Sequence, residues 1–344
     1  MADAFDSGYR LCLVIGSPDL SAELLAKPAA HAVRLVAIAR TADVSAAFEH
    51  LSSGGSGNVH DLRVALRRLR TWLRAYRPEL ADTLRKKTRR RLAAVAAATN
   101  GARDAEVALE WVTAIDGLSS REKPGARYMA ERLRLERDAA QAAARTTLDD
   151  DLPDILATLA DQLGTYWLRQ TLESSEKPND MATVTRDVLV RHASKFGQAL
   201  RRIQSSSDVA SKHRARIAAK RLRYLLETFA ANKDAAVLVV TLADLQDMLG
   251  VVCDGSLVAD LLLKEVGECA ARDARRTALA SLELDAKDDH TPPFTTIRPG
   301  LIALAKRVHQ GERTGFDAFR RRWRKRQIAG TVVAVAAVAE ALSP

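Results

Sequence analysis

The strongest constraint on how this chain folds is an internal repeat. Residues 60–70 and residues 213–223 both read H-x-x-R-[VI]-A-x-[RK]-R-L-R, with an offset of 153 residues and no gap. Downstream of each copy, at nearly the same separation, we expect a helix end that closes on an aspartate, Asp104 in the first copy and Asp254 in the second. Two segments that recur in the same order at nearly the same spacing predict a duplicated chain.

The rest of the pattern predicts helices almost throughout. Apolar residues recur at spacings of three and four from residue 21 onward, and only 5% of the chain is aromatic while Ala and Leu are plentiful. We therefore expect an all-α fold, with one short strand or none at residues 9–15. The expected helices span residues 59–76, 79–99, 105–115, 126–147, 155–173, 184–204, 212–229, 235–249, 256–271 and 301–325, and loops are expected at 52–58, 149–153, 205–207 and 285–299.

The length of the chain also favours two units. With 344 residues it exceeds one ordinary domain of about 100–200 residues. The polar stretch Glu173–Asp180 is the best candidate for a linker between the two repeats. The predicted segments are an N-terminal extension at 1–29, a first helical half at 30–173, a linker at 174–180, a second helical half at 181–326 and a C-terminal tail at 327–344.

Each copy of the repeat places its basic residues on one face of a helix, because spacings of three and four return to the same side. The neighbouring face of the first copy is apolar and carries Leu62, Leu66, Leu69 and Leu73. In the second copy Glu227 stands where Arg74 stands in the first. The two basic stripes are His60, Arg63, Arg67, Arg70 and Arg74 in the first copy, and His213, Arg216, Lys220 and Arg223 in the second.

Such a stripe indicates an anionic partner with many charges. Like charges four residues apart weaken a helix by a few tenths of a kcal/mol per pair, so folding alone gives no reason for the row. The formal charge of +10 comes mostly from arginine, whose planar fork of donors matches phosphate oxygens. The alternative is a solvated arginine face, but a stripe duplicated in register favours binding of a polyanion.

Other basic residues extend this hypothesis. Lys87 and Arg91 share a face of the next helix and are candidate ligands that lengthen the site. Arg103, beside Asp104, is either a phosphate ligand or half of an ion pair at a helix end. The run Arg320–Arg326 is either a second anion patch or an ordinary basic tail.

The paired H-x-x-R-x-x-x-[RK]-R-x-R segments, each followed by (G/N)-x-x-x-D, resemble the CHAD domain, the conserved histidine α-helical domain, over roughly residues 30–320. The resemblance implies two pseudo-symmetric four-helix bundles around a basic cavity that binds inorganic polyphosphate. It also implies that the histidines and cations of both stripes line that cavity, with Arg103 beside them. Cys253 replaces the polar residue expected in the second copy. The E-x-E-x-K signature of the triphosphate tunnel domain that often precedes CHAD domains is missing, so we expect a stand-alone CHAD protein.

We expect a binding protein and not an enzyme. The sequence lacks G-x-x-x-x-G-K-[ST] and H-E-x-x-H, so we predict neither a catalytic residue nor a cofactor nor a metal site. The acidic clusters at 149–151 and 288–290 could hold a metal, although loop acids are more often solvated. His60 and His213 sit among arginines, which disfavours the imidazolium, and a purely structural histidine remains an alternative there.

Three scattered cysteines, an acidic N-terminus and the absence of an apolar run near the roughly 18 residues of a membrane span predict a cytoplasmic protein without a membrane partner. Association with polyphosphate granules is a further expectation. Other phosphate-rich polyanions are possible partners, and the oligomeric state stays open. The main alternative is a basic helical protein that binds nucleic acid, and a polyphosphate hydrolase or kinase is the third hypothesis.

Overall fold

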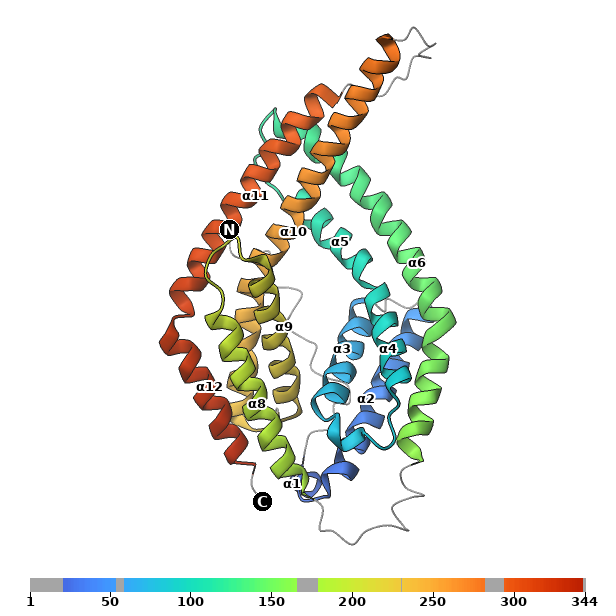
Figure 1. Ribbon diagram of the computed structural model, residues 1–344, viewed down its shortest axis with the longest axis vertical. Helices are drawn as coiled ribbons and strands as arrows, with labels where there is room; N and C mark the ends of the chain where they lie inside the picture. Colours follow the sequence, from blue (N-terminus) through green and yellow to red (C-terminus); the bar gives the residue numbers. More distant parts are fainter. Residues whose placement is uncertain (1–20, 54–58, 166–178, 230, 282–293, 343–344) are drawn as a thin grey trace.

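The computed structural model describes residues 21–53, 59–165, 179–229, 231–281 and 294–342, and the elements in these ranges are helices (Figure 1). Within them the only β-type pairing is one isolated bridge, between Pro28 and Asp180. The all-α class is therefore confirmed. The pseudo-symmetry of two four-helix bundles stays a prediction, and the possible strand at 9–15 lies outside the described residues.

The first repeat motif lies on α3 and the second on α9. In chain order the first part of the molecule contains α1 (Ala22–Leu25), α2 (Ala29–Ser52), α3 (Val59–Ala75), the 3-10 helix η1 (Pro78–Leu80), α4 (Lys86–Ala98), α5 (Asn100–Thr113) and α6 (Glu122–Gly164). The second part contains α8 (Met181–Arg201), α9 (Val209–Leu226), the 3-10 helix η2 (Glu227–Phe229), α10 (Lys233–Ser281), α11 (Phe294–Arg322) and α12 (Lys325–Glu340).

Two helices are longer than the sequence predicts. Helix α6 runs without a break through the expected loop at 149–153, although Pro153 lies inside it. Leu148, Leu152 and Ile155 are all buried there, so packing on one face outweighs the hydrogen bond that proline removes. Helix α10 likewise continues through Gly250, so Asp254 lies inside a helix and not at its end. Gly in a helix interior costs only about 1 kcal/mol relative to Ala, which burial of the neighbouring Leu249 and Val252 offsets.

The start of α11 also differs from the expectation, because Pro299 lies inside this helix and not in a loop. In the first repeat the expected helix end near Asp104 is a boundary between α4 and α5 at Thr99. The segment that we assigned to the C-terminal tail is helical, since it forms α12, which packs on α8. Ile328, Val335 and Val338 of α12 are buried in the main core.

The buried apolar residues form two clusters. The larger cluster joins α2, α3, α4 and the C-terminal part of α6 to α8, α9, α12 and the start of α10, so it spans both repeats. The predicted apolar face of α3 is confirmed, because Leu62, Leu66, Leu69 and Leu73 are each at most 2% exposed. The smaller cluster joins α5, the start of α6, the later part of α10 and α11. Figure 1 shows these four segments together at the end of the molecule away from α1.

Polar contacts tie the two repeats together at the ends of α3 and α9. The guanidinium of Arg68 on α3 donates to the Glu227 carboxylate in η2 at 2.9 Å. The Tyr76 hydroxyl, just after α3, shares a hydrogen bond of 3.1 Å with Thr185 on α8. Within the second part of the molecule, Lys212 on α9 is fully buried and donates to the Glu312 carboxylate of α11 at 2.5 Å.

Helix α10 has the length and composition of a membrane span over Lys233–Leu279, with a mean hydropathy of 1.8 in its most apolar window. This corrects the expectation that no stretch of the chain is long enough. The same helix packs against α9, α11 and α12 (Figure 1). Because core helices of domains in water have a similar composition, the stretch alone does not indicate a membrane.

Helices α6 and α11 cross with their backbones in contact. A Cβ atom added to Gly125 of α6 would lie 2.6 Å from the carbonyl carbon of Gly300 and from the nitrogen of Leu301. A Cβ atom on Gly300 would lie 2.8 Å from the Arg121 carbonyl oxygen and from the Gly125 nitrogen. The neighbours are backbone atoms that cannot rotate away, so this crossing requires glycine on both helices.

We expect the Gly300→Ala substitution to lower the free energy of unfolding by about 1–3 kcal/mol or more, because the added methyl group forces α6 and α11 apart. The matched control is Gly311→Ala on the same helix, where an added Cβ meets no atom within 4 Å. That change should stabilise the protein by up to about 1 kcal/mol through helix propensity. Urea denaturation of both variants measures the difference, and equal stabilities would contradict the close crossing.

Candidate functional site

A cavity of about 760 Å³ lies between α3 and α9, and α4, α5 and α10 complete its wall. Among the described residues that line it, arginine and lysine side chains outnumber carboxylates by twelve to two. The carboxylates are Asp104 and Asp254, one after each repeat. The cations are Arg63, Arg67, Arg70, Arg74, Arg77, Lys86, Arg89, Arg90, Arg103, Arg216, Lys220 and Arg221.

The structure brings together most of the residues that the sequence singled out. The basic face of α3 and most of the basic face of α9 line the same cavity, and Arg103 reaches it from α5. The two stripes therefore face one shared space and are not on opposite surfaces of the molecule. The predicted residues found in the lining are His60, Arg63, Arg67, Arg70, Arg74, Arg103, His213, Arg216 and Lys220.

Three predicted residues do not line the cavity. Arg91 points to α6 instead, where it pairs with Asp154 at 2.6 Å and with Asp151 at 3.4 Å. Lys87 is exposed on α4. Arg223 pairs with Glu227 at 3.2 Å, which is the acid that replaces the last cation of the stripe in the second copy.

Five lining cations were absent from the predicted set: Arg77, Lys86, Arg89, Arg90 and Arg221. Lys86, Arg89 and Arg90 belong to the basic run at the start of α4, whose other face we favoured. Arg221 directly follows Lys220 in the [RK]-R-L-R part of the repeat, one position outside the stripe. Its counterpart in the first copy, Arg68, is neutralised by Glu227, so the two copies use this position differently. The sequence signal for Arg221 is its position directly beside Lys220, on the face of α9 next to the basic stripe.

Several of the cations that line the cavity have no carboxylate partner. In the part of the chain that the structure describes, no carboxylate lies within ion-pair distance of Arg67, Arg70, Arg74 or Lys220. Burial, together with Arg216 and Arg67, lowers the pKa of Lys220 to about 7. Burial and the charges of Arg67 and Arg103 lower the pKa of Arg63 to about 10. Half-buried like charges that repel one another are costly without an anion between them.

Other cations of the lining have acidic neighbours. Arg216 lies 3.5 Å from Asp254, and Arg103 donates to Glu106 at 2.9 Å. Burial raises the pKa of Asp104 despite the nearby Arg63. Burial and the charge of Arg103 lower the pKa of His60, so its imidazole is neutral at pH 7. A neutral imidazole can still donate one hydrogen bond to an anion or to the backbone.

The lining of the cavity has the charge and the donors to bind an anion with several charged groups. Its donors come from several helices, so a ligand that engages most of them must itself extend across the space. Arginine forks and a lysine ammonium bind phosphate oxygens well. Among the described residues no group of three or more His, Cys, Asp or Glu side chains could hold a metal ion.

Solved structures with a similar fold exist for two named proteins. The crystal structure of the CHAD domain from the plant Ricinus communis matches with a TM-score of 0.55 and 23% identity, and the match covers 85% of this chain and 95% of that one. PptA from Streptomyces chartreusis matches with a TM-score of 0.61 and 15% identity, covering 86% and 99% of the two chains. No curated protein sequence matches. Residues 37–263, more than half of the chain, match the sequence profile of the CHAD domain, so this chain belongs to the CHAD domain family.

Proposed function

We propose that this protein binds inorganic polyphosphate in the basic cavity between α3 and α9. The observation that supports this most is the row of cations without carboxylate partners on two helices that face the same space. The CHAD family to which the chain belongs is associated with polyphosphate, which agrees with the chemistry of the lining. The proposal covers binding along the cavity, with His60, Arg63, Arg67, Arg70, Arg74, Arg103, His213, Arg216 and Lys220 as ligands.

A linear polymer of phosphates fits this lining better than a single small anion does. Successive cations on α3 are three or four residues apart, so each turn of 5.4 Å offers another positive charge. A polymer with a negative charge on every unit can follow such a row and also contact α9 opposite. Burial and the repulsion of neighbouring arginines lower the pKa values of Arg63 and Arg70, and binding of a polyanion would relieve the repulsion. A lone phosphate would neutralise only a few of these groups.

Nucleic acid is the second candidate, and the lining argues against it. Binding of single strands usually uses exposed aromatic rings on which bases stack. The Phe, Tyr or Trp residue in the described lining is Tyr224, which is 5% exposed and lies under the guanidinium of Arg223 at 5.2 Å. The described lining therefore offers many donors for phosphate and no exposed Phe, Tyr or Trp ring for a base.

We further propose that the protein binds polyphosphate without turning it over, in the cytoplasm and in association with polyphosphate granules. The sequence carries no phosphate-binding loop, and the lining contains two carboxylates that stand among twelve cations. In this proposal α10 is a core helix that packs against α9, α11 and α12 and does not cross a membrane. Release of phosphate from the polymer in the presence of Mg²⁺ or Mn²⁺ would overturn the non-enzymatic part.

Replacing Arg63 and Arg67 together by Ala should weaken polyphosphate binding by about 1.5–3 kcal/mol for each charge-assisted hydrogen bond that the change removes. The plot of log affinity against log salt should also become shallower by roughly 0.7 per cation removed. Isothermal titration at several salt concentrations measures both. The control is the double variant Arg127→Ala with Arg134→Ala. Both arginines are exposed on α6 and do not line the cavity. If both double variants bind equally well, Arg63 and Arg67 are not ligands.

The pKa of Lys220 predicts how binding depends on pH. Below about pH 7 the ammonium is charged in the free protein and in the complex, so its contribution to affinity is constant. As pH rises from about 7 toward the ordinary value of 10.5, the free protein loses this proton and must regain it on binding. Affinity should then fall by up to about tenfold per pH unit. Lys220→Arg keeps the charge and should flatten the profile, whereas identical profiles would contradict the shift.

A competition experiment separates the two candidate ligands. Polyphosphate should displace a labelled single-stranded DNA from the protein at far lower phosphate concentration than DNA needs to displace polyphosphate, because the described lining has no accessible Phe, Tyr or Trp ring for stacking. Fluorescence anisotropy with matched concentrations of phosphate units gives both curves. Mutual displacement at equal concentrations would favour a general binder of phosphate backbones.

A further inference from the structure

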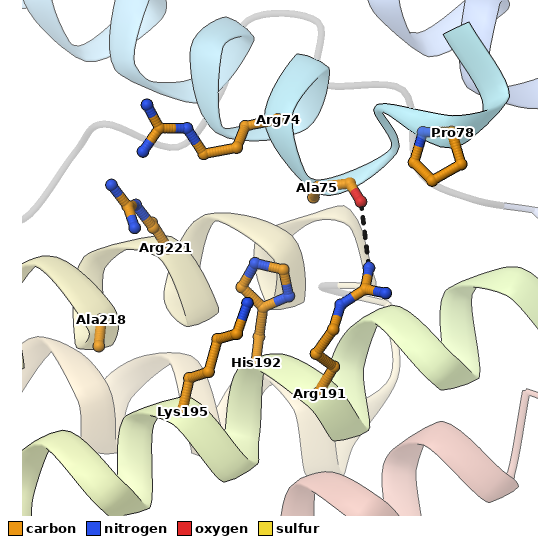
Figure 2. A pocket seen from close by; sticks show the side chains of 8 residues that line it. All are labelled: Arg74, Ala75, Pro78, Arg191, His192, Lys195, Ala218 and Arg221. Carbon is orange, nitrogen blue, oxygen red and sulfur yellow. Dashed lines mark hydrogen bonds between the residues drawn. The ribbon is translucent and has the colours of Figure 1, made fainter. Parts of the chain in front are cut away.

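A second, smaller basic cavity adjoins the first. It has a volume of about 330 Å³ and lies between the end of α3 and helices α8 and α9 (Figure 2). Its cations are Arg74, Arg191, Lys195 and Arg221, and the described residues that line it include no carboxylate. The sequence repeat gives no hint of this site, because Arg191 and Lys195 lie on α8, outside the motif.

The two cavities meet at a pair of arginines. Arg74 of α3 and Arg221 of α9 line both of them. Figure 2 shows their guanidinium groups extending toward each other from the two facing helices. Burial and the charges of Arg74 and Arg70 lower the pKa of Arg221, as expected for a cation held against other cations. An anion that lies between the two guanidinium groups therefore contacts both cavities at once.

Contacts with backbone carbonyl groups hold two side chains of the small cavity's lining in place. Arg191 donates to the Ala75 carbonyl oxygen at the end of α3 at 3.3 Å, which fixes the guanidinium at the edge of the cavity (Figure 2). The Nδ1 atom of His192 lies 2.8 Å from the Val188 carbonyl oxygen. Burial lowers the pKa of His192, with smaller effects from Lys195, Arg191 and Arg221, so this ring adds no charge near neutral pH. These side chains and Lys195 leave space for an anion among them.

We propose that the small cavity is a second phosphate subsite, into which a polyphosphate chain continues after it passes between Arg74 and Arg221. This inference rests on the proposed function, because it extends the same ligand beyond the main cavity. A chain of a few phosphates is held by the main cavity alone. A longer chain gains the contacts of Arg191 and Lys195, so the protein prefers long chains over short ones.

The test compares the two lengths of ligand on the full chain. Lys195→Gln removes one cation of the small cavity, and Lys195 has neither a hydrogen bond nor an ion pair with another described residue that folding would lose. Its control is Lys264→Gln, an exposed lysine of α10 that lines neither cavity. Arg67→Ala serves as the reference for the main cavity. The ligands are tripolyphosphate and a long polyphosphate, measured by titration at several salt concentrations.

We expect Lys195→Gln to weaken binding of the long polymer by about tenfold, the effect of one charge-assisted hydrogen bond, and to leave binding of tripolyphosphate unchanged. The salt dependence for the long polymer should also become shallower by roughly 0.7, again without change for tripolyphosphate. Arg67→Ala should weaken binding of both ligands, and Lys264→Gln of neither.

Two outcomes would overturn the second subsite while leaving the main site intact. In the first, Lys195→Gln binds the long polymer as tightly as Lys264→Gln does. In the second, it weakens binding of both ligands equally, which would place Lys195 in the main cavity. Failure of the wild-type protein to bind either ligand, or indifference of both ligands to Arg67→Ala, would instead overturn the proposed function itself.

Discussion

The fold must hold two rows of like charges on α3 and α9 close together across one cavity, against their mutual repulsion. Coulomb repulsion between half-buried guanidinium groups favours separation of α3 and α9. The opposite faces of these helices resist it, because Leu66 and Leu69 of α3 and Leu222 of α9 are almost fully buried in the core cluster shared by both repeats. Burial of one such side chain stabilises the fold by roughly 1.5–3 kcal/mol. This contribution comes from the apolar faces and does not depend on the charges in the cavity. The Arg68–Glu227 pair adds a direct link between the repeats.

The duplication leaves the two copies chemically unequal, and the inequality shapes the cavity. Glu227 in the second copy takes the place of a cation in the first, and it forms ion pairs with both Arg68 and Arg223. Arg221, which corresponds to Arg68, lines both cavities instead of pairing with this acid. This one acidic residue thus links the two repeats and pairs with two arginines that do not line the cavity. The cavity keeps its charge because other helices supply arginines that the repeat does not contain.

The sequence predicts the basic stripe and the fold class well, because both follow from a local period of 3.6 residues. It predicts helix ends less well, because tertiary packing decides them. Burial on one face carries α6 through Pro153, and burial of the residues around Gly250 keeps that glycine inside α10. Lys87 and Arg91 have the right charge and spacing, yet the carboxylates that draw Arg91 toward α6 come from residues 60 or more positions away. The cations that α8 contributes to the smaller cavity have no local signal, since they reach it only because α8 packs against α9 and Arg191 contacts the end of α3.

Binding and stability are coupled in such a site, although its cations do little to hold the fold together. Arg67, Arg70 and Lys220 have no ion-pair partner within the described residues, and burial together with neighbouring cations lowers the pKa values of Arg70 and Lys220. An anion bound to the folded state alone stabilises it by RT ln(1 + [L]/Kd), and here part of that gain is the relief of repulsion already present. In the proposed complex a phosphate beside Lys220 would favour the ammonium form, which burial and the neighbouring arginines oppose in the free protein. Above about pH 7 the proposed binding would therefore be accompanied by uptake of a proton.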